Sequence, residues 1–364
     1  MTMSDLGKWR ERLSAIDAEL LRLVAERHAL TGKIGEFKRA TGAATRDFAR
    51  EKEVLELARK QALSLGLSPE LAERLMSTLI RASLTQQERA RISAEGQGGG
   101  HTALVIGGAG KMGRWFVDYL ASQGYAVEVA DPAGEVAGIA CHKDWQDLEL
   151  HYALIIVATP LRTCDRILTA LAGRKPPGLI IDVASLKTPI RKGLEALVAG
   201  GCRVASLHPM FGPDTELLSG RHLVLVDIGQ PASLREARKL FSSTMVETVE
   251  MGLDEHDQVI AFVLGLSHAL NIAFFTALAE SGQKVPRLKE VSSTTFDAQL
   301  AVASSVSHES PTVYYEIQAL NEHGAEPLAA LESALVQLRT LIANADEQAF
   351  SRIMRRGAEY LDGV

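Results

Sequence analysis

The first forty residues form one uninterrupted amphipathic pattern, and no other feature constrains the fold of this chain as strongly. From Ser4 to about Arg39, apolar residues recur every three or four positions and no proline intervenes, which predicts a single helix that ends at Thr41-Gly42. A helix of about 35 residues is roughly 50 Å long. A domain of about 95 residues is too small to cover such a helix. We therefore expect a partner chain to pack against it.

Two more helices complete the predicted N-terminal domain. One follows Asp47, and the next begins at Ser68-Pro69, an N-cap followed by proline in the first turn, and runs to about Ala94. Glycines then dominate residues 96–101, which indicates a flexible linker. We therefore predict an all-α domain over residues 1–95 and a linker over 96–101.

The pattern after the linker changes to short buried strands that alternate with helical segments. This alternation predicts a parallel sheet with helices on both faces, a Rossmann-type α/β domain over residues 102–247. From about Met251 the strand patterns stop and helical patterns resume, so residues 248–364 are expected to form an all-α C-terminal domain whose last helices serve dimerisation. The predicted strands are Ala103–Ile106, Ala126–Ala130, Leu154–Ala158, Leu179–Asp182, Arg203–Leu207 and Leu223–Val226.

Composition narrows the class of protein. Of 364 residues, 46% are hydrophobic and 23% are charged, which is typical of a soluble globular protein, and the net charge of −6 argues against nucleic-acid binding. The longest apolar stretches, such as Ala153–Ala158, have the length of strands, so we expect no membrane association. The first residues lack a signal-peptide pattern, which predicts a cytoplasmic protein. Three cysteines without CxxC spacing predict neither a disulfide framework nor a metal site.

Cations lie among the apolar residues of the N-terminal helices. Arg10, Arg27 and Lys38 interrupt the hydrophobic pattern, and alternating charges in residues 46–51 mark the start of the second helix. Amide side chains follow in Leu84-Thr85-Gln86-Gln87. Several cations that converge inside a helical bundle need an anionic ligand, because unpaired buried charge is costly.

These motifs resemble the all-helical chorismate mutases over about residues 5–90. In that family two intertwined subunits form each site, and catalysis needs neither a nucleophile nor a proton transfer. The resemblance implies that Arg27, Arg50 and Arg10 of the partner subunit bind the two carboxylates of chorismate. Lys38 and Gln86 would contact the ether oxygen, and Glu51 with the Asp47 backbone would contact the ring hydroxyl. One departure is expected at Ala82, where the family commonly has a serine one turn before the glutamine.

A glycine-rich loop directly follows the first strand of the predicted α/β domain. Residues 108–113 have G-x-G-x-x-G spacing and open a helix, which is typical of a dinucleotide-binding turn. Asp131 closes the next strand, where a carboxylate accepts hydrogen bonds from ribose hydroxyls and repels a 2′-phosphate, so NAD is favoured over NADP. The residues expected to bind this cofactor are Gly108, Gly110, Lys111, Met112, Gly113, Asp131, Thr159 and Pro160.

Polar clusters follow two further strands, where folds of this class bind ligands. One is Asp182-Val183-Ala184-Ser185-Leu186-Lys187, and the other is His208-Pro209-Met210-Phe211-Gly212-Pro213-Asp214. Together with the glycine loop they resemble prephenate dehydrogenases over about residues 102–360. The whole chain therefore resembles the bifunctional chorismate mutase/prephenate dehydrogenases of tyrosine biosynthesis, which are homodimers.

The second resemblance implies roles for individual residues. His208 would accept the proton of the substrate 4-hydroxyl as hydride leaves C4 for NAD, and the product would be 4-hydroxyphenylpyruvate. Ser185 would orient that hydroxyl, and Lys187 would support the substrate site through structure or charge balance. His268 would face the pyruvyl side chain of prephenate, and His256 would lie near the domain junction.

The C-terminal domain departs from the family where substrate-binding arginines are expected. Ser305 and Asp297 occupy the positions that align with these arginines. The departure leaves three hypotheses open. The substrates are chorismate and prephenate, or the same reactions act on 4-amino-4-deoxychorismate and yield 4-aminophenylpyruvate, or the protein is a regulatory ligand-binding protein. The intact set of polar residues in the N-terminal domain argues against the third.

Overall fold

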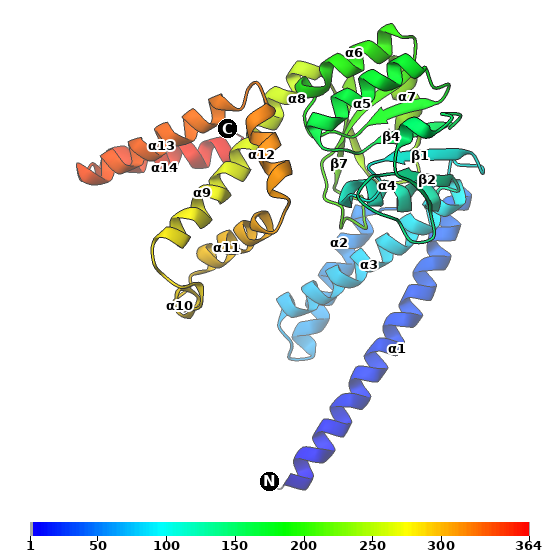
Figure 1. The fold of residues 1–364 in the computed structure, drawn as a ribbon. Coiled ribbons are helices and arrows are strands. Elements are labelled where there is room, and N and C mark those ends of the chain that lie inside the picture. The colour runs from blue at the N-terminus through cyan, green and yellow to red at the C-terminus, as the bar shows by residue number, and fades with distance from the viewer. Residues whose placement is uncertain (1–2, 364) are drawn as a thin grey trace.

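The computed structural model describes residues 3–363, so Met1, Thr2 and Val364 of the predicted terminal domains lie outside it. Three helices form the N-terminal part (Figure 1). They are α1 (Met3–Thr41), α2 (Phe48–Ser64) and α3 (Pro69–Glu95). The predicted N-cap at Ser68 is confirmed, because its side chain accepts a hydrogen bond from the backbone of Leu71. Asp47 caps α2 in the same way and accepts from the backbone of Arg50.

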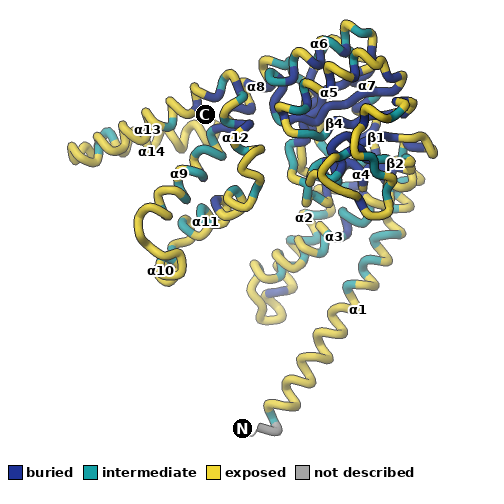
Figure 2. The backbone as a smooth tube through the Cα atoms, viewed as in Figure 1, coloured by how far each residue is buried: buried dark blue, intermediate teal, exposed yellow. Residues whose placement is uncertain are grey.

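Helix α1 is as long as its sequence predicts, and its N-terminal half extends beyond α2 and α3 (Figure 1). Its apolar side chains remain exposed within the single chain; Leu13 is 59% exposed and Leu20 is 52% exposed. Figure 2 shows the same half almost entirely in the colour of exposed residues. Large apolar faces of this kind mark interaction surfaces in soluble proteins.

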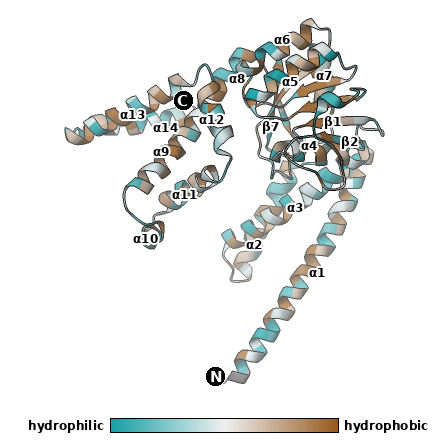
Figure 3. Cartoon of the chain, in the orientation of Figure 1, coloured by the Kyte–Doolittle hydropathy of each residue, from teal (hydrophilic) through white to brown (hydrophobic). Residues whose placement is uncertain are grey.

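The central part is an eight-stranded sheet in the order β3-β2-β1-β4-β5-β6-β7-β8. Helices α4 (Lys111–Ser122) and α7 (Pro231–Lys239) cover one face, whereas α5 (Leu161–Arg174) and α6 (Arg191–Ala199) cover the other. Figure 3 shows how strongly hydrophobic the strands are, as expected for strands buried on both faces. The strands are β1 (Thr102–Ile106), β2 (Ala126–Ala130), β3 (Ala140–His142), β4 (Leu154–Val157), β5 (Leu179–Asp182), β6 (Arg203–Pro209), β7 (His222–Asp227) and β8 (Glu247–Gly252).

The sheet differs from its prediction at one edge. Strand β7 runs antiparallel to β6, and β8 pairs with β7 in parallel, so the sheet is mixed. The chain reaches β7 through the loop 210–221 without a helical crossover, which permits the antiparallel pairing. Strand β8 also extends past the predicted boundary at residue 247, so the C-terminal part begins at Leu253. All six side chains of β8 are at least partly exposed, which explains why its hydrophobic signal is weak.

The glycine-rich segment 96–101 is packed, and its prediction as a flexible linker is wrong. The backbone N–H of Gly98 donates to the Gln123 carbonyl, and that of Gly100 donates to the Gly124 carbonyl. A Cβ atom at Gly96 would lie 2.4 Å from the Gln123 oxygen. These glycines therefore permit close backbone contact at the end of α4. Ile92 of α3 belongs to the hydrophobic core of the sheet domain, so this core also attaches the N-terminal helices to the sheet.

The C-terminal part is helical, as predicted, and its helices pack on the sheet domain only near α8 and α12 (Figure 1). One continuous helical segment, Leu253–Glu280, is long and apolar enough to cross a membrane by length and composition, so the prediction that apolar stretches do not exceed strand length is wrong. It contains α8 (Leu253–Ile260), the π-helical η3 (Ala261–Leu266) and α9 (Ser267–Glu280). The remaining helices are α10 (Val285–Glu290), α11 (Thr294–Ser307), α12 (Pro311–Leu320), α13 (Ala325–Ala343) and α14 (Glu347–Leu361). The short 3-10 turns are η1 (Trp145–Asp147) and η2 (Thr188–Ile190).

Two candidate active sites

The first candidate site lies between α1 and α3. Arg27 of α1 donates to the Ser83 hydroxyl and, at 2.9 Å, to the Leu79 carbonyl. Burial lowers the pKa of this guanidinium, although it stays charged at any physiological pH. Ser83 is buried, and its hydroxyl faces the Arg27 cation. The serine that the family commonly has on this face is therefore present as Ser83, and the prediction that Ala82 stands in its place is wrong.

The same one-residue shift affects the glutamine. Gln87 follows Ser83 by four positions and Gln86 by three, so both amides face α1. Gln86 contacts Gly32, where a Cβ atom would lie 3.5 Å from its Nε2, whereas Gln87 contacts α1 at Gly35, one turn from Lys38. The Oε1 atoms of both side chains are buried without a hydrogen-bond partner. Gln87 packs against Gly35 of α1, where a Cβ atom would lie 2.8 Å from its Cγ. The geometry thus favours Gln87 over Gln86 as the amide that faces the cations.

The remaining polar residues of this site come from the α1–α2 connection. Lys38 donates to the Thr45 carbonyl at 2.8 Å. Arg46 forms a bidentate pair with Glu51, with both contacts at 2.9 Å, so the Glu51 carboxylate already has a cationic partner. Arg50 points into solvent and pairs with Glu53.

Arg10 does not join this group within one chain. It precedes Arg27 by 17 residues on the same straight helix, which corresponds to roughly 25 Å at about 1.5 Å per residue. It lies on the exposed half of α1. Any contact between Arg10 and the anion held by Arg27 therefore requires a second chain.

The second candidate site begins at the glycine loop between β1 and α4. A Cβ atom at Gly113 would lie 2.0 Å from the Gly107 carbonyl oxygen, so only glycine lets α4 pack this closely on the loop. At the end of β2, the Asp131 carboxylate accepts from the backbone N–H of Ala109 at 3.0 Å. Asp131 lines a cavity of about 770 Å³ together with Gly110, Thr159 and Pro160. These residues fit a dinucleotide, and the buried Thr159 hydroxyl has no hydrogen-bond partner of its own.

A second cavity, of about 510 Å³, continues from the first beyond Gly110, Thr159 and Pro160. His208 at the end of β6 and Ser185 after β5 both line it, as the polar clusters predict. Lys111 and Met112 line the same cavity from the start of α4. The structure thus places the predicted base next to the end of the dinucleotide cavity.

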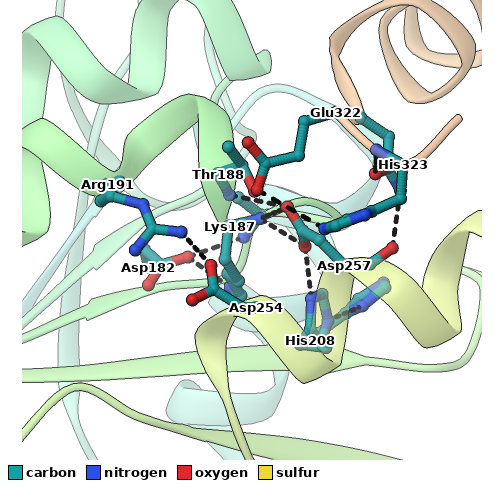
Figure 4. Close-up of polar contacts among 12 residues, drawn as sticks. Asp182, Lys187, Thr188, Arg191, His208, Asp254, Asp257, Glu322 and His323 are labelled. Atoms are coloured by element: carbon teal, nitrogen blue, oxygen red, sulfur yellow. Dashed lines mark hydrogen bonds and ion pairs between the residues drawn. The ribbon is translucent and has the colours of Figure 1, made fainter.

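His208 is the first member of a buried chain of three side chains (Figure 4). Its Nδ1 lies 2.9 Å from Nε2 of His256, and Nδ1 of His256 lies 2.6 Å from the Asp257 carboxylate. His208 is 5% exposed, and the other two are fully buried. The sequence predicts His256 only near the domain junction and does not single out Asp257. The signal was available in the pair His256-Asp257 on a helix that begins just after the last strand.

The electrostatics of this chain follow from burial and hydrogen bonding. Burial, with the neighbouring His256 and Lys187, holds the pKa of His208 well below its usual 6.5. Burial also lowers the pKa of His256. For Asp257, burial raises the pKa, but hydrogen bonds from His256 and Thr188 and from the Lys187 backbone outweigh it and bring the value to about 2. Asp257 is therefore an anion, and the two imidazoles are neutral at neutral pH.

Lys187 does not reach the cavity. Its side chain is fully buried, and its ammonium lies 2.6 Å from the Asp182 carboxylate and donates to the Leu207 carbonyl at 2.7 Å. Its backbone N–H donates to Asp257. The geometry thus supports the structural role among those predicted for Lys187 (Figure 4).

Helix α12 closes the cavity from the C-terminal domain. Glu309 pairs with Lys111 at 3.1 Å across the cleft, and the buried Glu316 accepts from the Leu161 backbone at 3.0 Å. Tyr314 lines the cavity and stacks on His268, with ring centroids 4.2 Å apart. Within the described residues, the lining includes Tyr314 but not His268, whose Nδ1 is buried without a partner and whose pKa is lowered by burial.

Ser305 and Asp297, at the positions of the expected arginines, lie on α11. Ser305 is exposed, and Asp297 lines a separate cavity between α9 and α11. The described lining of the His208 cavity contains no arginine. Its charged lining residues are Lys111, Glu309 and Glu316. Glu309 pairs with Lys111, and Glu316 pairs with Arg162 at 3.8 Å, so both carboxylates have a cationic partner.

Comparison with known protein families agrees with this division of the chain. Chorismate mutase type II matches residues 9–88. The nucleotide-binding domain of prephenate dehydrogenase matches residues 129–249, and the prephenate dehydrogenase dimerization domain matches residues 253–356. The last match begins at Leu253, where the structure also places the start of the helical part.

Individual relatives extend this result. The chain is 26% identical to the T-protein of Enterobacter agglomerans over 96% of its own length and 91% of the relative. It is 30% identical to a 4-amino-4-deoxyprephenate dehydrogenase of Streptomyces pristinaespiralis, over 69% of its length and 88% of the relative. A prephenate dehydrogenase structure from A. aeolicus, determined with hydroxyphenyl propionate and NAD⁺, shares its fold with a TM-score of 0.58, 19% identity and coverage of 72% of this chain and 98% of that one. The chain therefore belongs to the family of bifunctional chorismate mutase/prephenate dehydrogenases, NAD-dependent enzymes of tyrosine biosynthesis.

Proposed function

We propose that the two reactions divide between the two sites. In the mutase site, Arg27 with Arg10 of the partner subunit binds the carboxylates of chorismate, and Arg50 turns toward the same dianion when substrate binds. Lys38 and Gln87 donate to the ether oxygen, whose negative charge grows as the C–O bond breaks. Glu51, held by Arg46, contacts the ring hydroxyl with the Asp47 backbone. The site holds chorismate in a reactive conformer and stabilises developing charge.

The dehydrogenase proposal rests on one observation, the buried chain of hydrogen-bond contacts that joins His208 through His256 to Asp257. An ionised Asp257 can only accept, so Nδ1 of His256 carries the proton and Nε2 of His256 is an acceptor. Nδ1 of His208 must then donate to His256. This leaves Nε2 of His208 with a free lone pair, which is the group that a general base needs.

The chemistry of prephenate follows from this arrangement. Nε2 of His208 accepts the proton of the 4-hydroxyl, which Ser185 orients. NAD, when bound, supplies the acceptor for the hydride from C4. The carbonyl that forms at C4 draws the electron pair of the ring carboxylate bond, CO₂ leaves, and the ring becomes aromatic. The resulting phenolate oxygen takes the proton back from His208, which restores the neutral base. The positive charge on His208 is stabilised through His256 by the Asp257 anion.

The cofactor residues have supporting geometry. The glycine loop presents the N-terminus of α4 to a pyrophosphate, and Asp131 lines the cavity where a ribose would lie. The Thr159 hydroxyl, buried and without a partner, is available to a polar group of the cofactor at the junction of the two cavities. His268 would act on the substrate through Tyr314, against which it stacks.

A cytoplasmic homodimer fits these sites. The exposed apolar face of α1 and the distance between Arg10 and Arg27 call for a second mutase domain. The C-terminal helices expose further apolar residues, such as Val336 and Ile342, which a second dimerisation domain would cover. The three cysteines are free thiols, in keeping with a reducing compartment.

A second candidate function is the same pair of reactions on the 4-amino series. It is favoured by the described lining of the His208 cavity, which contains no arginine, and by Asp297 and Ser305 in place of the expected arginines. A 4-ammonium group reduces the negative charge of the substrate by one unit, which suits a cavity whose described lining has no arginine. The relative from Streptomyces pristinaespiralis carries the name of this activity.

One assay separates the candidates. The purified protein receives NAD with either chorismate or 4-amino-4-deoxychorismate at saturation, and NADH formation is followed. The leading proposal predicts faster turnover from chorismate. Faster turnover of the amino substrate would reverse the order of the two candidates, and no turnover of either would favour a regulatory ligand-binding protein.

A further inference from the structure

A buried carboxylate of the mutase helix reaches into the dehydrogenase domain. Glu88 lies on α3, one residue after Gln87, and is 1% exposed. Its two oxygens accept hydrogen bonds from the backbone N–H groups of Leu218, at 2.8 Å, and Met245, at 2.6 Å. Burial raises the pKa of this carboxyl, against the effect of the two hydrogen bonds. Among the described residues, it forms no ion pair with a cation.

Leu218 belongs to the loop 210–221, which follows His208-Pro209 and contributes to the wall of the His208 cavity. Phe211 and Pro213 of this loop line the cavity beside Ser185 and His208. The loop contains no helix or strand. Within it, the Thr215 and Arg221 backbone N–H groups donate to the carbonyls of Gly212 and Leu218, and contacts from other segments complete its support.

Two other mutase residues contact the same loop. Arg46, the partner of Glu51, donates to the Ser219 hydroxyl at 2.8 Å. Arg89 forms an exposed ion pair with Glu216 at 3.2 Å. Within the dehydrogenase domain, Trp115 of α4 donates to the Thr215 carbonyl at 3.0 Å. Of these contacts, the one from Glu88 is the most deeply buried, and it alone joins the loop to Met245 ahead of β8.

We infer that Glu88 is a positioning residue for the dehydrogenase site, supplied by the mutase domain. By holding Leu218 and Met245 together, it fixes the loop that shapes the substrate side of the His208 cavity. The dehydrogenase therefore requires the mutase helix α3 for its full affinity for substrate. This inference rests on the proposed role of the His208 cavity.

The test compares Glu88→Ala and Glu88→Gln with the full-length enzyme. Alanine removes both acceptors, whereas glutamine keeps one acceptor oxygen and turns an N–H₂ group toward the second donor. We expect the KM for prephenate to rise at least tenfold in Glu88→Ala and by a smaller factor in Glu88→Gln. The kcat of NADH formation and the mutase rate should change less than threefold, because the His208–His256–Asp257 chain and the mutase side chains are untouched.

Arg89→Gln is the matched control, since it removes an exposed contact from the same helix to the same loop. It should leave the KM within twofold, because exposed ion pairs contribute little. If Glu88→Ala does not fold, Glu88→Gln carries the test, and it should raise the KM twofold to fivefold. A folded Glu88→Ala enzyme with an unchanged KM overturns the inference.

Hydrogen–deuterium exchange of residues 210–221 decides the same point without a substrate. Exchange there should rise in Glu88→Ala and not in Arg89→Gln. Unchanged exchange refutes the role of Glu88 in holding the loop, even if prephenate proves not to be the substrate. Lack of NADH formation by the unmodified enzyme would instead refute the proposed function alone.

Discussion

The two active sites differ in how much of each a single chain supplies. The proposed proton acceptor of the dehydrogenase and its two partners come from one chain, because β6 and α8 bring His208, His256 and Asp257 into hydrogen-bond contact. The mutase site holds Arg27 and Lys38 but leaves Arg10 far away on an exposed helix. A sheet gathers side chains from distant segments at one edge, whereas three extended helices gather them only when a second copy packs against them.

The largest expected effect comes from removing the dehydrogenase base. His208→Asn should reduce NADH formation from prephenate by about a thousandfold, because a general base contributes about 10² to 10⁴ in rate. Chorismate consumption by the same variant should remain within twofold of the unmodified enzyme. Loss of both activities would show that the sites are not independent and would remove the basis of the comparison.

The reciprocal variant tests the mutase site. Lys38→Ala should reduce chorismate rearrangement by about a hundredfold or more, since one donor to a developing anion contributes about 10² to 10³ in rate. NADH formation from added prephenate should be retained. A mutase that survives this change would refute the placement of Lys38 at the ether oxygen.

A smaller effect is expected from the end of the hydrogen-bond chain. Asp257→Asn removes the anion that stabilises protonated His208, so kcat should fall roughly tenfold to a hundredfold. Asp257 raises the pKa of His208, so its loss should also move the acidic limb of kcat/KM to lower pH. An unchanged pH dependence of kcat/KM would mean that Asp257 acts only through its contacts with the backbone of residues 187 and 188.

The pH dependence of the unmodified dehydrogenase has a definite sign. His208 must be neutral to accept a proton, and its pKa lies well below 6.5. NADH formation should therefore stay constant as the pH falls from neutral through 6.5 and decline only at lower pH. A limb centred at or above 6.5 would contradict the buried position of His208.

Local signals in the sequence predicted much of this molecule. The regular spacing of apolar residues predicted helix α1, and the glycine spacing together with Asp131 predicted where the dinucleotide cavity lies. The same reasoning missed Glu88, because a glutamate on a helix resembles a solvated residue until its partners Leu218 and Met245 are known. It also misjudged the glycines of 96–101, since close backbone packing and flexibility favour the same residue. The choice of Ser83 over Ala82 and of Gln87 over Gln86 depends on which face of α3 packs against α1, and only the structure gives this direction.

Subunit mixing tests most directly whether the mutase site, unlike the dehydrogenase site, needs two chains. Arg10→Ala and Lys38→Ala enzymes, each nearly inactive as mutases, are unfolded together, refolded and assayed. In a mixed dimer one site combines both defects and the other combines an intact Arg10 with an intact Lys38. The account predicts recovery of about a quarter of the unmodified mutase activity for random pairing. No recovery, with mixed dimers shown to form, would contradict it.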